Sequence, residues 1–286
     1  MSIEETPVAP APAVPDPAVF AEEWESWHRE RDARLADPHG WLAITALHWL
    51  SDEPQTFSGA PGRWSTGPEG VVVELDAGTE LVVGSETVRG RHLFGVVPER
   101  GGVDAVWEDT VIEVAKRGGH DVIRPRHPGH PARTAFTGTP AYAPDPRWVV
   151  EGRYEVFEAP RPTTVGASVE GLRHVYDAPG RVVFRLDGRE FALTAFNGHA
   201  PGTLTVLFTD ATSGVTTYAA NRSLAVDVSG PGDAVVLDFN RAVNLPCAYT
   251  DFATCPLPPA ENRLPVAVEA GERIPRERGP VGGPSE

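Results

Sequence analysis

The chain has almost no lysine, methionine or cysteine. Lys116 is the only lysine, Met1 the only methionine, and Cys247 and Cys255 are the only cysteines among 286 residues. Two cysteines in a chain of this length do not make a disulfide framework, so the fold has to depend on a packed core. No apolar run approaches the ~18 residues that a membrane-spanning helix needs. The sequence therefore predicts no membrane partner.

Positive charge is also scarce, since the net charge is −15. Nucleic-acid-binding proteins present basic patches, and no run of Lys or Arg occurs here, so we expect no nucleic-acid partner. The first twenty residues are acidic and proline-rich and lack the basic and apolar regions of a secretory signal, which predicts a cytoplasmic protein. No nucleotide-binding loop, dinucleotide fingerprint or nucleophile elbow is present, and we expect no cofactor. The oligomeric state does not follow from the sequence.

The pattern of apolar residues predicts a mainly β protein with one N-terminal helix. Asp16 and Pro17 suit the start of a helix, and apolar residues at helical spacing continue to Leu35. Residues 40–50 are apolar on every side and fit either a buried helix or a buried strand. From residue 57 onward, short β-branched runs alternate with Gly, Pro and Asp about every ten residues, which is typical of an antiparallel sandwich or barrel-like fold.

Four regions follow from this pattern. Residues 1–16 read as a disordered Pro/Ala-rich tail, 17–120 as the helix with a first β unit, 121–273 as a second β unit, and 274–286 as a disordered tail. Asp187-Gly188, between two apolar runs, predicts a type I′ hairpin. The run at 264–271 is expected to return to the sheet as a strand.

Residues 238–272 form the most distinctive segment of the chain. They contain both cysteines, three prolines near Cys255 and many short polar side chains, a composition typical of a loop with a fixed irregular shape. With Gly40-Trp41-Leu42, Asp145-Pro146-Arg147-Trp148 and Asp210–Gly214, this segment resembles the bacterial family of unknown function DUF1684 over about residues 20–274. Leu245 stands where that family usually has proline. The resemblance implies a shared fold and an important surface, and it implies no established activity.

The polar residues of this segment are the candidate site. Arg binds carboxylates and phosphates through its planar fork, Asn orients a ligand, and a carboxylate with a raised pKa can act as a general acid or base. The candidate catalytic residues are Asp238, Glu261 and Glu272, and the candidate substrate-binding residues are Arg222, Asn240, Arg241, Asn244, Tyr249 and Asn262. The same residue types also lock turns by bonding to backbone groups.

Three interpretations of Cys247 and Cys255 remain open: packed thiols, a reversible disulfide, or a nucleophile or metal ligand. His120, His127 and His130 are loosely spaced, and a structural zinc site normally shows two tight ligand pairs, so no metal is expected.

Three functional hypotheses follow. The protein could be an enzyme acting on a small anionic metabolite in a pocket walled by residues 238–262. It could be a binding or sensing module that uses the same pocket without turnover. It could also have no ligand there, the polar residues merely satisfying buried backbone groups.

Overall fold

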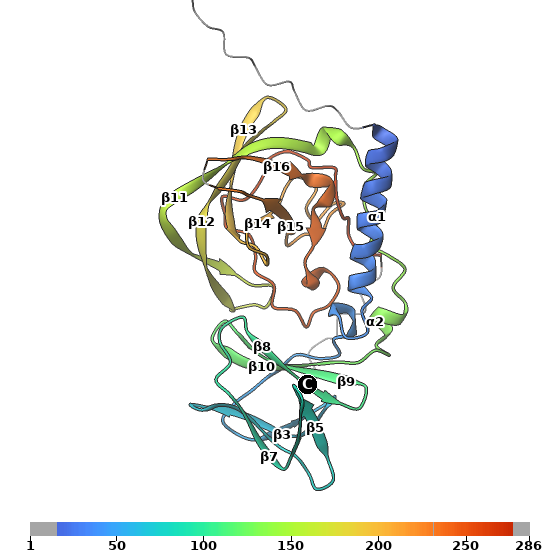
Figure 1. The fold of residues 1–286 in the computed structure, drawn as a ribbon, viewed down its shortest axis with the longest axis vertical. Helices are drawn as coiled ribbons and strands as arrows, with labels where there is room; N and C mark the ends of the chain where they lie inside the picture. Colours follow the sequence, from blue (N-terminus) through green and yellow to red (C-terminus); the bar gives the residue numbers. More distant parts are fainter. Residues whose placement is uncertain (1–15, 231, 277–286) are drawn as a thin grey trace, which may run out of the picture.

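The computed structural model describes residues 16–230 and 232–276. These residues form three antiparallel sheets and one long helix, α1 (Pro17–Leu35), which confirms the predicted fold class. The sheets divide into a first unit, drawn below in Figure 1, and a second unit above it. The predicted tails lie almost wholly outside the described residues.

The first unit contains two sheets. One has the strand order β1 (His48–Trp49), β10 (His120–Arg126), β9 (Thr110–Arg117), β8 (Gly102–Trp107), β5 (Glu80–Val83), β6 (Glu86–Arg89). The other has the order β2 (Gln55–Phe57), β3 (Ala60–Gly67), β4 (Gly70–Glu74), β7 (Arg91–Gly95). Because β10 pairs with β9 along its whole length, the first unit extends to residue 126.

The second unit is one seven-stranded sheet. Its order is β16 (Ala234–Asp238), β11 (Val149–Gly166), β12 (Arg173–Leu186), β13 (Arg189–Asn197), β14 (Thr203–Phe208), β15 (Arg222–Asp227), β17 (Val243–Asn244). β11 is one long strand with a bulge between Val156 and Arg161. The predicted hairpin is confirmed: Asp187 and Gly188 join β12 to β13 with φ of 51° and 75°.

The short helices lie in the connections. The α-helix α2 (Pro131–Thr134) follows the first unit, and four 3₁₀ turns are η1 (Trp41–Ala43), η2 (Pro146–Trp148), η3 (Phe239–Arg241) and η4 (Pro246–Ala248). Residues 40–50 are thus neither one helix nor one strand, since they hold η1 and the two-residue strand β1.

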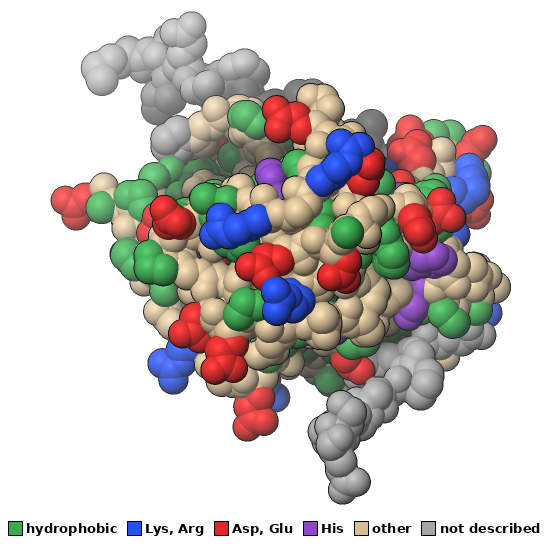
Figure 2. Space-filling view, turned by 90° about the horizontal axis from the view of Figure 1, so that it is seen from below, with side chains coloured by type: hydrophobic (Ala, Val, Ile, Leu, Met, Phe, Trp, Pro, Cys, Tyr) green, Lys and Arg blue, Asp and Glu red, His purple; other side chains and the backbone are tan. Residues whose placement is uncertain are grey.

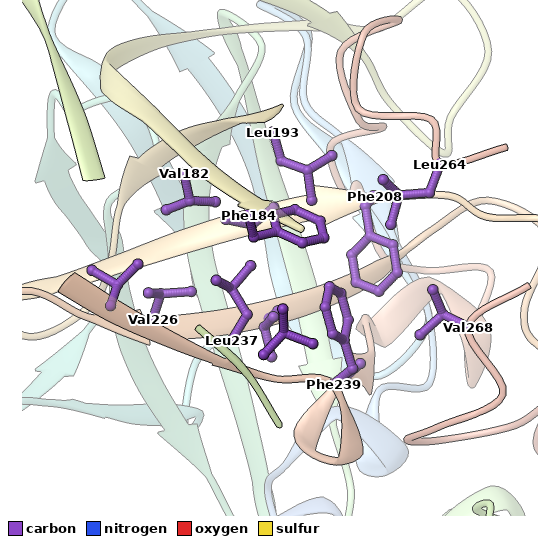
Figure 3. Close-up of a cluster of buried hydrophobic side chains, with 14 of the residues drawn as sticks. Val182, Phe184, Leu193, Phe208, Val226, Leu237, Phe239, Leu264 and Val268 are labelled. Atoms are coloured by element: carbon purple, nitrogen blue, oxygen red, sulfur yellow. The ribbon is translucent and has the colours of Figure 1, made fainter. Parts of the chain in front are cut away.

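Three phenylalanines lie at the centre of the core of the second unit. Phe239 contacts Phe184 and Phe208, with ring centroids 5.6 and 5.7 Å apart, and Leu193, Leu237 and Val268 surround them (Figure 3). Each large apolar side chain buried in this way contributes about 1.5–3 kcal/mol to folding. The core therefore fixes the position of η3, which begins the distinctive segment.

The helix α1 packs along the second unit (Figure 1), although the sequence grouped it with the first. The Asp16 carboxylate accepts a hydrogen bond from the Ala18 amide and caps the helix, as predicted. Trp24 then donates its indole N–H to the carbonyl of Asn240 at 2.7 Å. Arg31 reaches Glu272 at 3.1 Å. These polar contacts tie the helix to the segment after β16.

The predicted strand at 264–271 is wrong. Its backbone bonds partly to the main chain of residues 209–211, since Leu264 N–H donates to Thr209 O and Ala211 N–H donates to Val266 O, and partly to side chains. The guanidinium of Arg222 donates to the carbonyls of Val268 and Ala270, and the Asp210 carboxylate accepts from the Val268 amide at 2.6 Å. Arg222 and Asp210 are also an ion pair at 3.4 Å and are both buried.

Replacing Arg222 by Met should leave the Asp210 carboxylate buried without its cation and two carbonyls without donors. Loss of one partner of such a pair costs about 3–5 kcal/mol. Urea unfolding of Arg222→Met should show this loss, whereas the control Arg263→Met, at an exposed arginine, should change stability by less than about 0.5 kcal/mol. Equal stability of the two variants would contradict this account of residues 264–271.

Candidate functional site

The two units enclose a pocket of about 540 Å³ where they meet. Trp41, Arg100, Arg117 and Arg124 line it from the first unit. The second unit contributes His174, Tyr176, Phe196, Asn197, Gly198, His199, Thr205, Leu207, Ser223, Leu245, Pro246, Thr254, Cys255 and Pro256. The lining contains three guanidiniums and no carboxylate.

A buried carboxylate, Glu113 on β9, positions two of these arginines. Arg124, its cross-strand partner on β10, donates to both of its oxygens, at 2.6 and 3.0 Å. Arg117 donates to it at 2.9 Å, and Arg126 also bonds to it. Burial alone would raise the pKa of Glu113, but the guanidiniums of Arg124 and Arg126 outweigh this and lower it. One negative charge thus holds three positive ones.

The two pocket arginines that bond to Glu113, Arg117 and Arg124, each keep an N–H group that makes no hydrogen bond. In Arg124, which is 1% exposed, Nε and Nη2 bond to Glu113, while Nη1 makes no hydrogen bond. In Arg117, Nη1 and Nη2 bond to backbone carbonyls and Glu113, while Nε makes none. Burial, followed by the positive charge of the neighbouring Arg124, lowers the pKa of Arg117, while the charges of Glu113 and Glu99 act in the opposite direction.

Arg100 is the third cation and is not paired with any described carboxylate. Its guanidinium lies 4.5 Å from the centre of the Tyr176 ring, a cation–π contact. Its φ of 64° lies in the left-handed region that side chains rarely adopt. Hydrogen bonds from Arg100 N–H to Lys116 O and from Gly101 N–H to Pro98 O fix this turn. Such backbone, kept by its surroundings, is found most often at functional sites.

His174 on β12 is the buried base of the second unit's wall. Its Nε2 lies 2.8 Å from the carbonyl of Thr254, so that nitrogen carries the proton. The other nitrogen, Nδ1, is buried and has no hydrogen-bond partner among the described residues. A neutral His174 therefore keeps an unused lone pair at the edge of the pocket.

The two cysteines are free, buried and adjacent. The Cys247 amide donates to the sulfur of Cys255 at 3.3 Å, and only Cys255 lines the pocket. The hydrogen bond between the thiols lowers the pKa of Cys247 and raises that of Cys255. Packed thiols describe this arrangement best.

The candidate site residues near position 240 make contacts that support the fold. Asn240 is 1% exposed and exchanges hydrogen bonds with the backbone of Asp145 at 2.9 and 3.0 Å. Asp238 caps η3 by accepting from the Asn240 amide and pairs with Arg241 at 3.2 Å. Arg241 is largely exposed and lies over Trp27 of α1. Arg222, as described above, holds residues 264–271.

A second group of proposed residues meets around Glu272. Its carboxylate accepts from Arg31, from the Asn244 amide at 2.6 Å and from the Tyr249 hydroxyl at 3.1 Å. Burial, followed by the negative charge of Glu272, raises the pKa of Tyr249. This cluster is sealed, since Glu272 and Asn244 are each 1% exposed.

The last two proposed residues lie after η4 and bond to Thr194 of β13. Asn262 is fully buried and bonds to the backbone of Thr194 and Leu207. Glu261 is exposed and accepts from the Thr194 hydroxyl at 3.0 Å.

None of the proposed catalytic or substrate-binding residues lines the pocket, so this geometry favours the structural alternative for them. Residues 238–262 do form part of its wall, through Leu245, Pro246, Thr254, Cys255 and Pro256. The pocket arginines of the first unit are not among the site residues predicted from the sequence. A signal existed: Glu113 and Arg124 each interrupt an apolar strand, in TVIEVAK and DVIRPR, and lone charges in neighbouring apolar strands indicate a buried ion pair.

Another hollow, of about 520 Å³, lies within the first unit beside Trp107–Thr110 and His127. Its charged side chains, Glu108 and Asp109, are acidic and are balanced by no arginine in the lining. His127 and His130 bond to nearby backbone groups. Within residues 16–230 and 232–276, no group of three or more His, Cys, Asp or Glu is arranged to hold a metal ion.

Known proteins resemble mainly the second unit. Residues 134–273 match the model of a family described as a protein of unknown function, DUF1684. The chain belongs to the DUF1684 family. This confirms the resemblance seen in the sequence, although the matched residues begin after the three pocket arginines. The DUF1684 match thus covers the second unit's wall of the pocket, with Cys255 and His174, and leaves out the cationic wall.

One solved structure is similar over about half of this DUF1684 chain. It is the solution NMR structure of an uncharacterized protein from Haloarcula marismortui, 36% identical, covering 49% of this chain and 78% of its own, with a TM-score of 0.42. No curated protein matches the chain. Among the described helices, none is long and apolar enough to cross a membrane.

Replacing Glu113 by Gln should remove the charge that holds three guanidiniums together. We expect a loss of about 3–5 kcal/mol at pH 7, as for a broken buried ion pair. Because the pKa of Glu113 is lowered in the fold, its contribution is complete above the unfolded value of about 4.3 and disappears as the pH falls through the folded pKa. Urea unfolding should therefore show that the difference in unfolding free energy between wild type and Glu113→Gln becomes smaller below about pH 4.

The exposed Glu86, which has no ion pair among the described residues, provides the control. The unfolding free energy of Glu86→Gln should differ from that of wild type by less than about 0.5 kcal/mol, both at pH 7 and below about pH 4. If Glu113→Gln behaved in the same way, the carboxylate would not organise this wall.

Packed thiols should react only when the segment opens. With an aromatic disulfide reagent, Cys247 and Cys255 should be labelled at least about a hundredfold more slowly in the folded protein than in guanidinium, corresponding to an opening free energy of about 3 kcal/mol. Rapid labelling of one thiol in the folded protein would instead support the nucleophile interpretation.

Proposed function

We propose that the protein binds a small anionic molecule in the pocket between its two units. One observation carries this proposal: three guanidiniums with unused N–H groups line a pocket whose lining contains no carboxylate. Arg117 and Arg124 share the single charge of Glu113, and the exposed Arg100 has no carboxylate partner among the described residues, so the pocket offers positive charge and hydrogen-bond donors to an anion. Aromatic and aliphatic side chains with a few polar groups complete the wall, as in most small-molecule sites.

The chain as a whole is acidic, whereas the pocket is lined by arginines, and this contrast supports a local function for these arginines. The chain carries a net charge of −15, and its end at the first unit mixes acidic, basic and apolar side chains without one dominant kind over the described residues (Figure 2). The pocket therefore presents three guanidiniums and no carboxylate on a chain that is acidic as a whole. A pocket of this kind attracts and orients an anion in a protein that otherwise repels one.

An aromatic anion should stabilise the protein through Arg100. We expect 1-naphthoate or 1-naphthyl phosphate to raise the midpoint of thermal unfolding, by about 5–10 °C at a hundredfold excess over Kd, while neutral 1-naphthol does not. Arg100→Ala should weaken binding roughly 10–100-fold, because hydrogen bonds to charged groups contribute about 1.5–3 kcal/mol.

The matched control is Arg91→Ala, since Arg91 is also an exposed arginine of the first unit with no ion pair among the described residues. It should bind like wild type. Stabilisation by the anions that persists in Arg100→Ala would place the binding site elsewhere on the molecule.

Turnover of the bound anion is the second candidate, and His174 is the observation that favours it. An imidazole with one nitrogen fixed by the Thr254 carbonyl and the other without a partner is arranged to accept a proton. Conversion of a bound anion by wild type, with unchanged binding and no conversion in His174→Asn, would support an enzyme. A ligand recovered intact after prolonged incubation would support a binding module.

A further inference from the structure

The two walls of the pocket differ in chemical character. All three of its arginines come from the first unit: Arg100 at the turn before β8, Arg117 at the end of β9 and Arg124 within β10. Most of its apolar side chains come from the second unit: Tyr176, Phe196, Leu207, Leu245, Pro246 and Pro256. A ligand that satisfies both walls has an anionic end and an apolar end.

The anionic end faces more donors than a carboxylate uses. The fork of a single arginine satisfies both oxygens of a carboxylate. Here Arg100 offers all of its side-chain N–H groups. Arg124 adds its Nη1, and Arg117 adds its Nε. Donors from three separate guanidiniums suit the three terminal oxygens of a phosphate group, each of which is a strong acceptor.

The charge around the pocket also fits a dianion. Five guanidiniums belong to the pocket, its adjoining hollow and the Glu113 cluster: Arg100, Arg117, Arg124, Arg126 and Arg173. Three carboxylates lie among them: Glu113 in the cluster, Asp104 beside Arg126, and Glu99 in the hollow with Arg173. Two positive charges remain, and they balance the two negative charges that a phosphate monoester carries in its doubly ionised form.

The apolar end suits a flat body. The rings of Tyr176 and Phe196 lie with centroids 5.4 Å apart, and Arg100 covers Tyr176. Leu207 and Leu245 contact the same region. Flat rings pack well against such aromatic walls, and about 540 Å³ accommodates a molecule of drug size.

We propose that the ligand of this pocket is a phosphate monoester of a flat, largely apolar alcohol. The inference rests on the proposed function and names the ligand class of the same site. The phosphate lies against Arg100, Arg117 and Arg124, and the flat body lies against Tyr176, Phe196 and Leu245.

Calorimetric titration with matched naphthyl compounds tests this. At pH 7.5 we expect 1-naphthyl phosphate to bind at least about tenfold more tightly than 1-naphthyl sulfate, 1-naphthoate or inorganic phosphate. The second pKa of a phosphate monoester is about 6, so its dianion falls about fourfold between pH 7.5 and 5.5, and its affinity should fall by a similar factor.

The sulfate ester serves as the pH control, because it remains a monoanion over this range. The imidazoles of His174 and His199 also line the pocket. Any change in the charge of these imidazoles would alter the binding of both esters, so the difference between the esters isolates the charge of the phosphate. Burial raises the pKa of Tyr176, and the hydrogen bond with Cys247 followed by burial raises the pKa of Cys255, so these two groups stay neutral over this range.

The outcomes separate the two proposals. Equal affinity for the phosphate and the sulfate or carboxylate, lost in Arg100→Ala, would overturn the phosphate class and keep anion binding. Inorganic phosphate as tight as 1-naphthyl phosphate would overturn the flat apolar body. No binding of any probe, or binding that Arg100→Ala leaves unchanged, would overturn the proposed function as well.

Discussion

The buried carboxylate of Glu113 is the interaction on which the candidate site depends. It lies on β9 inside the first unit and orients three guanidiniums that could not remain buried without it. Its single negative charge cannot neutralise three guanidiniums, so a net positive charge remains where the two units meet. The first unit thus supplies a rigid cationic wall because the pairing of β9 with β10 places Glu113 opposite Arg124.

The second unit depends on a different set of buried polar groups. Asp210, Arg222, Asn240, Asn244, Asn262 and Glu272 bond mainly to backbone and fix the irregular segment after β16. That segment in turn supplies Leu245, Pro246, Thr254, Cys255 and Pro256 to the pocket. The DUF1684 match covers this unit. Its polar residues therefore hold this wall of the pocket in place without lining the pocket themselves.

Local signals in the sequence predicted the local structure well. Asp16 and Pro17 determine the start of α1, and Asp187-Gly188 determines a hairpin, because each effect depends on neighbouring residues only. Residues 264–271 have the composition of a strand, but they form only isolated main-chain bonds to residues 209–211, and Arg222 and Asp210, distant in sequence, bond to the rest of the run. The pocket was missed for the same reason. Whether Arg124 or Asn240 faces a cavity depends on partners in other strands, which the spacing of residues along one chain does not contain.

The location of the ligand tests the central claim most directly. Crystals soaked with a bromine-labelled aryl phosphate would reveal the bromine by its anomalous scattering and the phosphate by its density. The account predicts the phosphate within hydrogen-bond distance of Arg100, Arg117 and Arg124, and the bromine signal beside Tyr176, Phe196 and Leu245. A phosphate bound against Arg241 or Asn240, or on the surface of either unit with the pocket empty, would contradict it.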